Sequence, residues 1–414
     1  MTQQTQTKQL PRGWKEATLK ELSIKITDGT HQTPKYLSEG IPFISTTNLI
    51  TGGKDFDFGK YKKFISKENY KELTKSCIPE KGDILISKCG TIGRTQLVRI
   101  NYPFSIFVGL GLIKIKKETI LGEYLEYFLT SPKVQKELER LAPGSTRRTL
   151  TIGAINQVNI YYPESKEEQQ LIVSEIETQF SRLDEAVKVL KLVKDKLKVY
   201  RKAVLKKAFE RDSWEYSKIG KIFKTSSGGT PSRANKRYYT GNIPWLKSGE
   251  LMDKTNIEDS EEHISKEALE KSSAEIFPID TTLIAMYGAT TGKIGIIKKE
   301  CSTNQAICGI FPNQDSLSKF IFYFLLFKRE RIINQSKGGA QPNINQEIIK
   351  NLDFPLLSKI IQQSVVQEIE SKFSVIDKVE EVVNQSLIKA EALRKSILKS
   401  AFEGKLVKTE EMQK

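Results

Sequence analysis

The chain contains one stretch twice, and this duplicated stretch determines the fold. The first copy ends with Lys202-Ala203-Val204-Leu205-Lys206-Lys207-Ala208-Phe209-Glu210, and the second ends with Lys395-Ser396-Ile397-Leu398-Lys399-Ser400-Ala401-Phe402-Glu403. Upstream, Gln169-Gln170 matches Gln362-Gln363, and Asp184 matches Asp377. Each match has the same offset of 193 residues, as from 202 to 395, so one duplication without internal gaps explains both copies.

Both copies predict a long amphipathic helix, from about Glu168 to Phe209 and from about Gln362 to Phe402. Neither copy contains a proline or an interior glycine. Apolar residues recur every three or four positions, which is typical of a coiled coil, and about 40 residues would form a rod of roughly 60 Å. So narrow an apolar seam is not stable alone in water, and we expect the two copies to pair antiparallel. The alternative is two ordinary amphipathic helices on separate cores.

The predicted seam can be written out for both copies. Its members are Ile176, Phe180, Leu183, Val187, Leu190, Val193, Leu197, Tyr200, Val204 and Ala208 in the first copy, and Ile369, Phe373, Ile376, Val383, Leu387, Ala390, Leu393, Ile397 and Ala401 in the second.

Composition limits the class of protein. A chain of 414 residues with 38% hydrophobic residues can form two or more packed domains. The N-terminus is polar, unlike a signal peptide, and the longest apolar run, Phe320 to Phe327, is too short to cross a membrane. The four cysteines form no Cys-x-x-Cys pair, and only two histidines are present. We therefore expect a cytoplasmic protein with reduced thiols and no metal site.

A formal net charge of +16 and a pI near 9.4 favour a polyanionic partner. The charge is concentrated between Lys188 and Arg211, where ten lysines or arginines face only two acids, Asp195 and Glu210. Such a stripe is suited to a phosphate backbone. An acidic protein surface is the alternative partner.

The remaining chain predicts two globular segments of mixed α and β structure. In the first, β-type runs separated by glycine and proline occupy residues 41–45, 83–87, 97–100 and 110–115. A helix follows from about Leu121 to Leu141, and Ser131-Pro132 should interrupt it. The predicted divisions are 1–165 for the first domain, 166–210 for the central helix, 211–358 for the second domain, 359–405 for the C-terminal helix and 406–414 for a tail.

The second segment repeats the order of the first with few identities. Ile41-Pro42-Phe43 corresponds to Ile243-Pro244-Trp245, and Gly93-Arg94 corresponds to Gly292-Lys293. The helices are close copies, whereas the globular segments share only a scaffold. Two domains that read different targets from one frame would show this contrast.

Several motifs recur in the same order in both halves. They are Asp28-Gly29-Thr30-His31-Gln32-Thr33-Pro34, Ser227-Gly228-Gly229-Thr230-Pro231-Ser232, Gly90-Thr91-Ile92-Gly93, Gly288-Ala289-Thr290-Thr291-Gly292-Lys293-Ile294-Gly295, the two Ile-Pro-aromatic strands and the Gln-Gln starts of both helices. Through these motifs the chain resembles the specificity subunit of type I restriction–modification systems over nearly all of residues 10–405.

The resemblance implies an α+β fold in which two pseudo-repeated α/β target-recognition domains are separated by two long antiparallel coiled-coil helices. It implies double-stranded DNA as ligand, with a bipartite site and one half-site for each domain. It also implies two methyltransferase subunits docked on the helices, and restriction subunits in the full complex. S-adenosylmethionine is expected on the methyltransferase and ATP on the restriction subunit, with no cofactor on this chain.

The residues also favour a non-catalytic chain. We find no Asn-Pro-Pro-Tyr or Asp-Pro-Pro-Tyr methylation box, and no Gly-x-Gly opens a cofactor-binding β-α turn. The segment Gly288 to Ile294 has the wrong spacing for a phosphate loop, and Ile294 stands where Ser or Thr would bind magnesium. Two alternatives stay open: a stand-alone two-headed DNA-binding regulator, and a methyltransferase or nuclease in its own right. The missing motifs speak against the second.

Polar loop residues are the candidates for DNA contact, because base edges are read by hydrogen bonds while phosphate contacts set position. The candidates in the first domain are Thr30, His31, Lys35, Thr46, Thr47, Asn48, Lys88, Arg94, Arg147 and Arg148. Those in the second are Thr230, Ser232, Arg233, Tyr239, Lys247, Ser248, Tyr287, Lys293 and Gln341. Apolar helix residues beside the seam are candidates for partner docking, with core packing as an equal alternative: Val173, Val189, Leu192, Val199, Val366, Val379, Val382 and Leu398.

Overall fold

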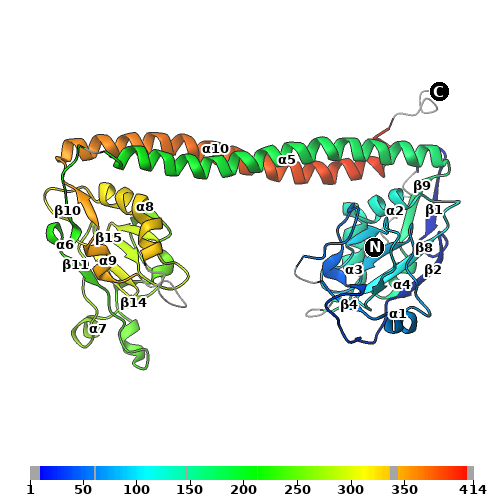
Figure 1. Ribbon diagram of the computed structural model, residues 1–414, viewed down its shortest axis with the longest axis horizontal. Helices are drawn as coiled ribbons and strands as arrows, with labels where there is room; N and C mark the ends of the chain where they lie inside the picture. The colour runs from blue at the N-terminus through cyan, green and yellow to red at the C-terminus, as the bar shows by residue number, and fades with distance from the viewer. Residues whose placement is uncertain (1–9, 60–61, 145–147, 212, 336–343, 408–414) are drawn as a thin grey trace, which may run out of the picture. The chain divides into compact units, whose positions relative to one another are not determined.

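The computed structural model describes residues 10–59, 62–144, 148–211, 213–335 and 344–407. The chain divides into two compact units, residues 1–190 with 385–414, and residues 191–384. Each unit contains one globular domain and a part of both long helices (Figure 1). The boundary between the units therefore falls inside the helices.

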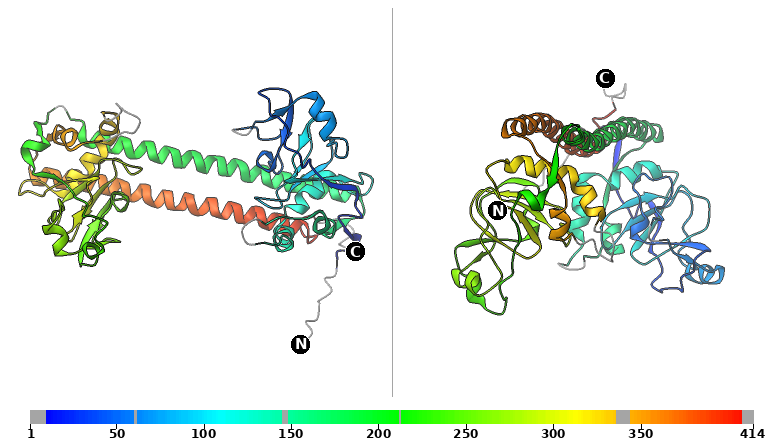
Figure 2. Two further views of the ribbon diagram at one scale, coloured as in Figure 1. Left: turned by 90° about the horizontal axis from the view of Figure 1, so that it is seen from below. Right: turned by 60° about the vertical axis from the view of Figure 1, so that its left-hand side comes forward.

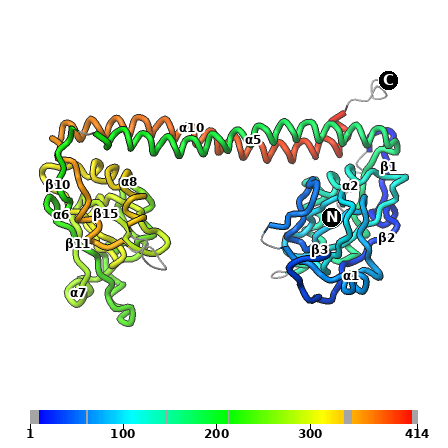
Figure 3. Tube along the Cα trace, viewed as in Figure 1, coloured from blue at the N-terminus to red at the C-terminus, as the bar shows by residue number. Residues whose placement is uncertain are grey.

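The long helices are α5 (Lys166–Phe209) and α10 (Lys359–Ala401), of 44 and 43 residues. Within each unit they lie side by side, although they are far apart in sequence (Figures 2 and 3). Their direction follows from two contacts in the second unit, where Arg201 pairs with Asp377 and Lys194 donates to Asn384 Oδ1 at 2.8 Å. One residue number rises as the other falls, which confirms the antiparallel pair.

The predicted seam is buried or half-buried, with two exceptions at equivalent repeat positions. Tyr200 and Leu393 are 50% and 52% exposed, so they were wrongly assigned to the seam. A period of three to four residues leaves the facing side ambiguous by one position, which explains the error.

Among its described residues, the domain of the first unit is built on three small sheets. The strands are β1 (Trp14–Thr18) paired with β9 (Asn159–Pro163); the sheet β2-β8-β5-β6 (Ser23–Asp28, Leu110–Ile115, Ile84–Ser87, Thr95–Leu97); and the sheet β4-β3-β7 (Phe64–Ile65, Ile41–Ile44, Ser105–Ile106). The helices are η1 (Thr46–Asn48), α1 (Lys67–Leu73), α2 (Gly122–Leu129), α3 (Pro132–Leu141) and α4 (Ile152–Asn156). The gap between α2 and α3 confirms the predicted interruption at Ser131-Pro132.

The strand expected at 97–100 lies at Thr95–Leu97 instead. Its register places Leu97 opposite Ile84 and Thr95 opposite Ile86, so the buried polar residues Thr95 and Gln96 belong to the strand. The apolar pattern of the sequence does not assign Thr95 and Gln96 to the strand, because both residues are polar.

The domain of the second unit repeats this topology. Its strands are β10 (Tyr216–Lys218) with β19 (Asp353–Pro355); the sheet β11-β18-β15-β16-β13 (Thr225–Ser227, Ile307–Ile310, Thr282–Ala285, Ile294–Ile297, Lys254–Ile257); and the sheet β14-β12-β17 (His263–Ile264, Ile243–Leu246, Ser302–Thr303). Its helices are α6 (Ile219–Ile222), η2 (Lys236–Tyr239), η3 (Ser248–Glu250), α7 (Lys266–Glu270), α8 (Ser318–Gln335) and α9 (Gln346–Lys350). The additional strand β13 and the uninterrupted α8 distinguish it from the first domain.

The helix ends form part of both domain cores. In the first unit, Ile176 of α5 and Ile397 of α10 belong to the same buried cluster as the domain. In the second unit, Val204 of α5 and Ile369 of α10 do the same. Each helix pair is thus stabilised by the domain on which it packs as well as by its own seam.

The Gln-Gln motifs fix the start of each long helix to its domain. Gln169 is fully buried; its Oε1 accepts from Leu121 N at 2.9 Å, and its Nε2 donates to Thr119 O and Pro163 O at 3.1 and 2.9 Å. Gln362 makes the matching set, with Leu317 N at 2.9 Å and with Asp315 O and Leu357 O at 2.8 Å each. The duplication therefore preserves a polar anchor as well as an apolar seam.

Candidate nucleic-acid interface

Three of the predicted residues in the first domain gather around Asp28, at the end of β2. Thr30 N donates to Ile106 O at 2.9 Å, which fixes this loop beside β7. His31 Nε2 lies 3.8 Å from Asp28 Oδ2 and its side chain is 74% exposed. Lys88 forms an ion pair with Asp28 and is 6% exposed. Lys88 therefore supports the loop, while His31 is presented to solvent.

The predicted residues Thr46, Thr47 and Asn48 form η1. Asn48 is buried; its Oδ1 accepts from Ser45 N at 2.9 Å and its Nδ2 donates to Asp57 O at 2.7 Å, so it holds the loop in shape. Thr47 is exposed beside it. Arg94 reaches the same loop, with Nη1 3.4 Å from Leu49 O.

The remaining candidates of the first domain lie elsewhere. Lys35 is exposed on the loop that follows Asp28 to Pro34. Arg148 is exposed and donates from Nε to Gly144 O at 3.3 Å. Arg147 lies outside the described residues.

In the second domain, two predicted residues converge on the carboxylate of Glu262, and a third, Tyr239, stacks against one of them. Arg233 Nη1 donates to Glu262 Oε2 at 2.6 Å, and Lys247 Nζ lies 3.1 Å from Glu262 Oε1. The Arg233 guanidinium carbon lies 4.1 Å from the centre of the Tyr239 ring and 5.0 Å from that of Trp245. The Glu262 carboxylate raises the pKa of Arg233, and Arg233 lowers that of Glu262. We call Arg233, Tyr239, Trp245, Lys247 and Glu262 the stacked-arginine cluster.

Other predicted residues of the second domain are dispersed. Thr230 hydrogen-bonds Gln305, Ser232 is exposed, Ser248 is half-buried in η3, and Tyr287 is half-buried after β15. Lys293 Nζ lies 3.0 Å from Asp253 Oδ2. Gln341 lies outside the described residues.

Sequence reasoning missed the acids that organise these sites, namely Asp28, Asp253 and Glu262. Basic, amide and hydroxyl side chains are the types expected to contact base edges and phosphates, and carboxylates are not among them. Asp253 is held by Arg329 and Lys293, and both it and Met252 have positive φ, at 59° and 43°. Two successive non-glycine residues with positive φ form a strained turn that the surrounding ion pairs stabilise.

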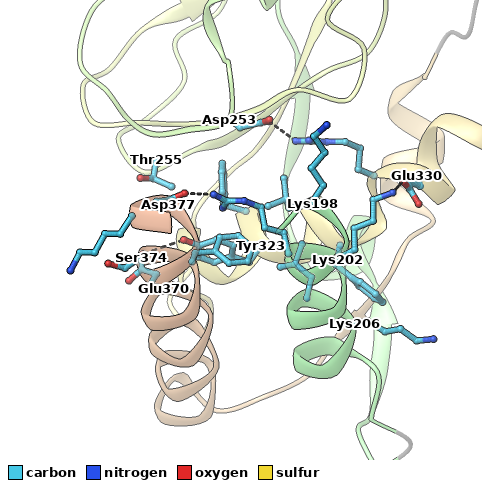
Figure 4. Close-up of a pocket in the computed structure, with 18 of the residues that line it drawn as sticks. Lys198, Lys202, Lys206, Asp253, Thr255, Tyr323, Glu330, Glu370, Ser374 and Asp377 are labelled. Carbon is cyan, nitrogen blue, oxygen red and sulfur yellow. Dashed lines mark hydrogen bonds and ion pairs between the residues drawn. The ribbon is translucent and has the colours of Figure 1, made fainter. Parts of the chain in front are cut away.

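A separate groove in the second unit lies where α5, α8 and α10 meet (Figure 4). Its volume is about 1050 Å³. Tyr323 and Phe373 line it together with charged residues such as Lys202, which pairs with Glu330, and Asp377, which pairs with Arg201. Arg201 and Lys202 of the basic stripe on α5 are therefore paired with acids within this unit.

The described residues include no group of three or more His, Cys, Asp or Glu side chains able to bind a metal ion. All four cysteines are free thiols. Burial raises the pKa of Cys77 to about 11 and those of Cys301 and Cys308 to about 12, so these thiols are poor nucleophiles. In the same part of the chain, no helix is long and apolar enough to cross a membrane.

Comparison with known proteins assigns the family. The family model described as "Type I restriction modification DNA specificity domain" matches twice, at residues 11–191 and 211–399. The first match covers one domain and the first part of α5, and the second covers the other domain and nearly all of α10. The chain therefore belongs to this family, with two DNA specificity domains.

Full-length relatives and solved structures agree with the assignment. The type I restriction enzyme StySPI specificity subunit of Salmonella potsdam is 26% identical over 427 residues, covering 96% of this chain and 90% of the relative. The EcoKI specificity subunit of Escherichia coli K12 is 24% identical over 439 residues, with the same coverage. The HsdS subunit from Thermoanaerobacter tengcongensis shares the fold, with a TM-score of 0.57, 15% identity and coverage of 96% and 98%. A chain from work on "complex assembly and conformational transition of the type I R-M system" has a TM-score of 0.77, 16% identity and coverage of 96% and 99%.

Proposed function

We propose that this chain is the specificity subunit of a type I restriction–modification complex, and that it reads a bipartite site in double-stranded DNA. The observation that carries the proposal is the paired construction of the two units. Each domain packs on both long helices through the same type of shared core and holds the start of one of them through the same buried glutamine, while its polar loops differ. One scaffold with two sets of loops is suited to two different half-sites.

The helices supply the surface for partners. The predicted docking residues Val173, Val366 and Leu398 are buried in the domain cores, which supports the alternative of core packing for these three. Val189, Leu192, Val199, Val379 and Val382 are 39–67% exposed. Apolar side chains exposed along a helix pair favour partner helices, since such patches commonly mark interaction sites. We assign them to two methyltransferase subunits, with restriction subunits joining the full complex.

This chain itself would be non-catalytic and would carry no cofactor. S-adenosylmethionine would bind the methyltransferase subunit and ATP the restriction subunit. A stand-alone regulator finds no support among the relatives, which are specificity subunits of restriction enzymes.

The test is a methylation map. The chain is co-expressed with its methyltransferase subunit in a host that lacks modification, and the host DNA is sequenced for modified bases. The proposal expects a split motif with an unread spacer, absent when this chain is omitted. An assembled complex that leaves the DNA unmodified, with S-adenosylmethionine present, would contradict it.

A further inference from the structure

The two domains present opposite charges at one equivalent backbone position. In the first domain, Phe43 N donates to Lys63 O at 2.9 Å, and Pro42 pairs with Phe64 of β4. In the second, Trp245 N donates to Glu262 O at 2.8 Å, and Pro244 pairs with His263 of β14. Residues 63 and 262 therefore occupy the same place, directly before the short edge strand.

Each domain also has an aromatic shelf beside this position, made by a tyrosine packed on the aromatic residue of the central strand. Tyr36, in a loop, and Phe43 have ring centres 5.7 Å apart in the first domain. Tyr239, at the end of η2, and Trp245 have the same separation in the second. The shelf is thus common to both domains, although the segments that supply the tyrosines differ in structure.

A cation lies over the tyrosine in both domains, but it comes from different positions. In the first domain it is Lys63 itself, whose Nζ lies 4.3 Å from the Tyr36 ring centre. In the second it is Arg233, 4.1 Å from the Tyr239 ring centre. Position 262 carries the glutamate that binds Arg233. Both domains therefore have a cation stacked on the tyrosine, but it is a lysine ammonium in the first domain and an arginine guanidinium in the second.

The stacked cations are suited to base reading. The Arg233 side chain is 53% exposed, and its bond to Glu262 uses Nη1. Among the described residues, no partner hydrogen-bonds Nη2. An arginine fork can bind guanine O6 and N7 together, and lysine binds the same acceptors as a point charge. Stacking and the carboxylate limit the rotamers of Arg233 before DNA arrives, which reduces the entropy lost on binding.

We propose that positions 63 and 262 are equivalent specificity-determining positions, with Lys63 reading a guanine in one half-site and Arg233, positioned by Glu262, reading a guanine in the other. This inference rests on the proposed function, because it names the residues that read within each domain.

The experiment uses the complete methyltransferase complex and duplexes in which every base pair of both half-sites is varied. In the complex that carries Lys63→Gln, the preference for one G·C pair in a single half-site should fall by about 5- to 150-fold. Arg233→Gln should have the same effect at one pair of the other half-site. In each variant the unaffected half-site serves as the internal control for folding.

Three further variants separate positioning from charge. Glu262→Gln retains Arg233, so it should weaken the preference at the Arg233 base pair alone and leave overall affinity at least as high. Lys62→Gln and Arg237→Gln remove exposed charges that are near Lys63 and Arg233 in the sequence, and they should leave the preference at every base unchanged.

The outcomes are distinguishable. If Arg233→Gln weakens binding to all DNA sequences equally, Arg233 contacts phosphate and the inference is wrong. If Arg233→Gln and Lys63→Gln leave every base preference intact, both clusters are only structural. If the complex with the wild-type chain methylates no split motif, the proposed function itself fails, whatever the variants do.

Discussion

Arg201 of α5 pairs with Asp377 of α10, and the duplication makes the same contact again between Arg394 and Asp184. Both arginines also lie over an equivalent phenylalanine, with Arg201 5.0 Å from the ring centre of Phe373 and Arg394 4.2 Å from that of Phe180. Each phenylalanine in turn meets a tyrosine of its own domain, at 5.8 Å in both units. The helix pair and the attached domain are therefore joined in the same way twice.

Removing one of these arginines should cost little, because the ion pairs are solvent-exposed. We expect Arg201→Ala to lower the free energy of unfolding by about 1 kcal/mol, from the ion pair and the contact with Phe373 together. Asp377→Ala should cost less than Arg201→Ala, since it leaves the ring contact intact. Urea denaturation of the single and double variants measures the coupling free energy between Arg201 and Asp377. A coupling free energy near zero would mean that this ion pair does not stabilise the fold.

The buried glutamines should matter far more than their neighbours. Gln169→Ala leaves one N–H and two carbonyl groups without their partner, and we expect a loss of about 3 kcal/mol. Gln170→Ala is the matched control: it alters the adjacent, exposed glutamine and should stay within about 0.5 kcal/mol. Gln362→Ala and Gln363→Ala form the same comparison in the second unit. If replacing Gln170 or Gln363 lowered the free energy of unfolding as much as replacing Gln169 or Gln362, the buried glutamines would not anchor the helices.

The reaction rate of each cysteine should follow its burial. In the native chain at pH 8, the half-buried Cys89 should react with a disulfide reagent, whereas Cys77, Cys301 and Cys308, which are 0–5% exposed, should react only after unfolding. Their raised pKa values also give a sign for stability. Above pH 9 the unfolded chain releases thiol protons that the folded chain retains, so these groups favour unfolding as pH rises. A rapid reaction of two thiols in the native chain would contradict this assignment.

The exposed valines of the helices should affect assembly and leave folding intact. Val199 and Val382 are 67% and 62% exposed. Val199→Glu and Val382→Glu should change the free energy of unfolding by about 0.5 kcal/mol or less, yet weaken binding of the methyltransferase subunit in a pull-down. Val173→Ala, within the core of the first unit, is the contrasting variant, because it should lower stability and retain binding. Full assembly of both glutamate variants would place the docking surface elsewhere.

The helices could be predicted from sequence because their signal is local. Apolar spacing and the offset of 193 residues are visible in the chain itself, and α5 ends at Phe209 as expected. The stacked-arginine cluster could be predicted only in part. Glu262 meets Arg233 because β12 and β14 pair, and no pattern in a single sequence joins residues 29 positions apart through that register.

Polar residues with a structural role were equally hard to recognise. Asn48 and Lys88 have the chemistry of DNA-reading residues, but the first holds η1 in shape and the second is paired with Asp28. Whether a polar loop residue faces solvent depends on tertiary contacts, which composition does not contain.

In the proposed function, the helix pair holds two independent readers of one DNA site. The most direct measurement removes seven residues from each helix, Val187–Val193 and Gln385–Glu391. These segments lie between the Asp184–Arg394 and Lys194–Asn384 contacts, and a full heptad preserves the phase of the seam. Each helix shortens by about 10 Å, close to three base pairs. The methylation map of the deleted complex should show both half-sites unchanged and the unread spacer about three base pairs shorter; altered half-sites with the original spacer would contradict the account.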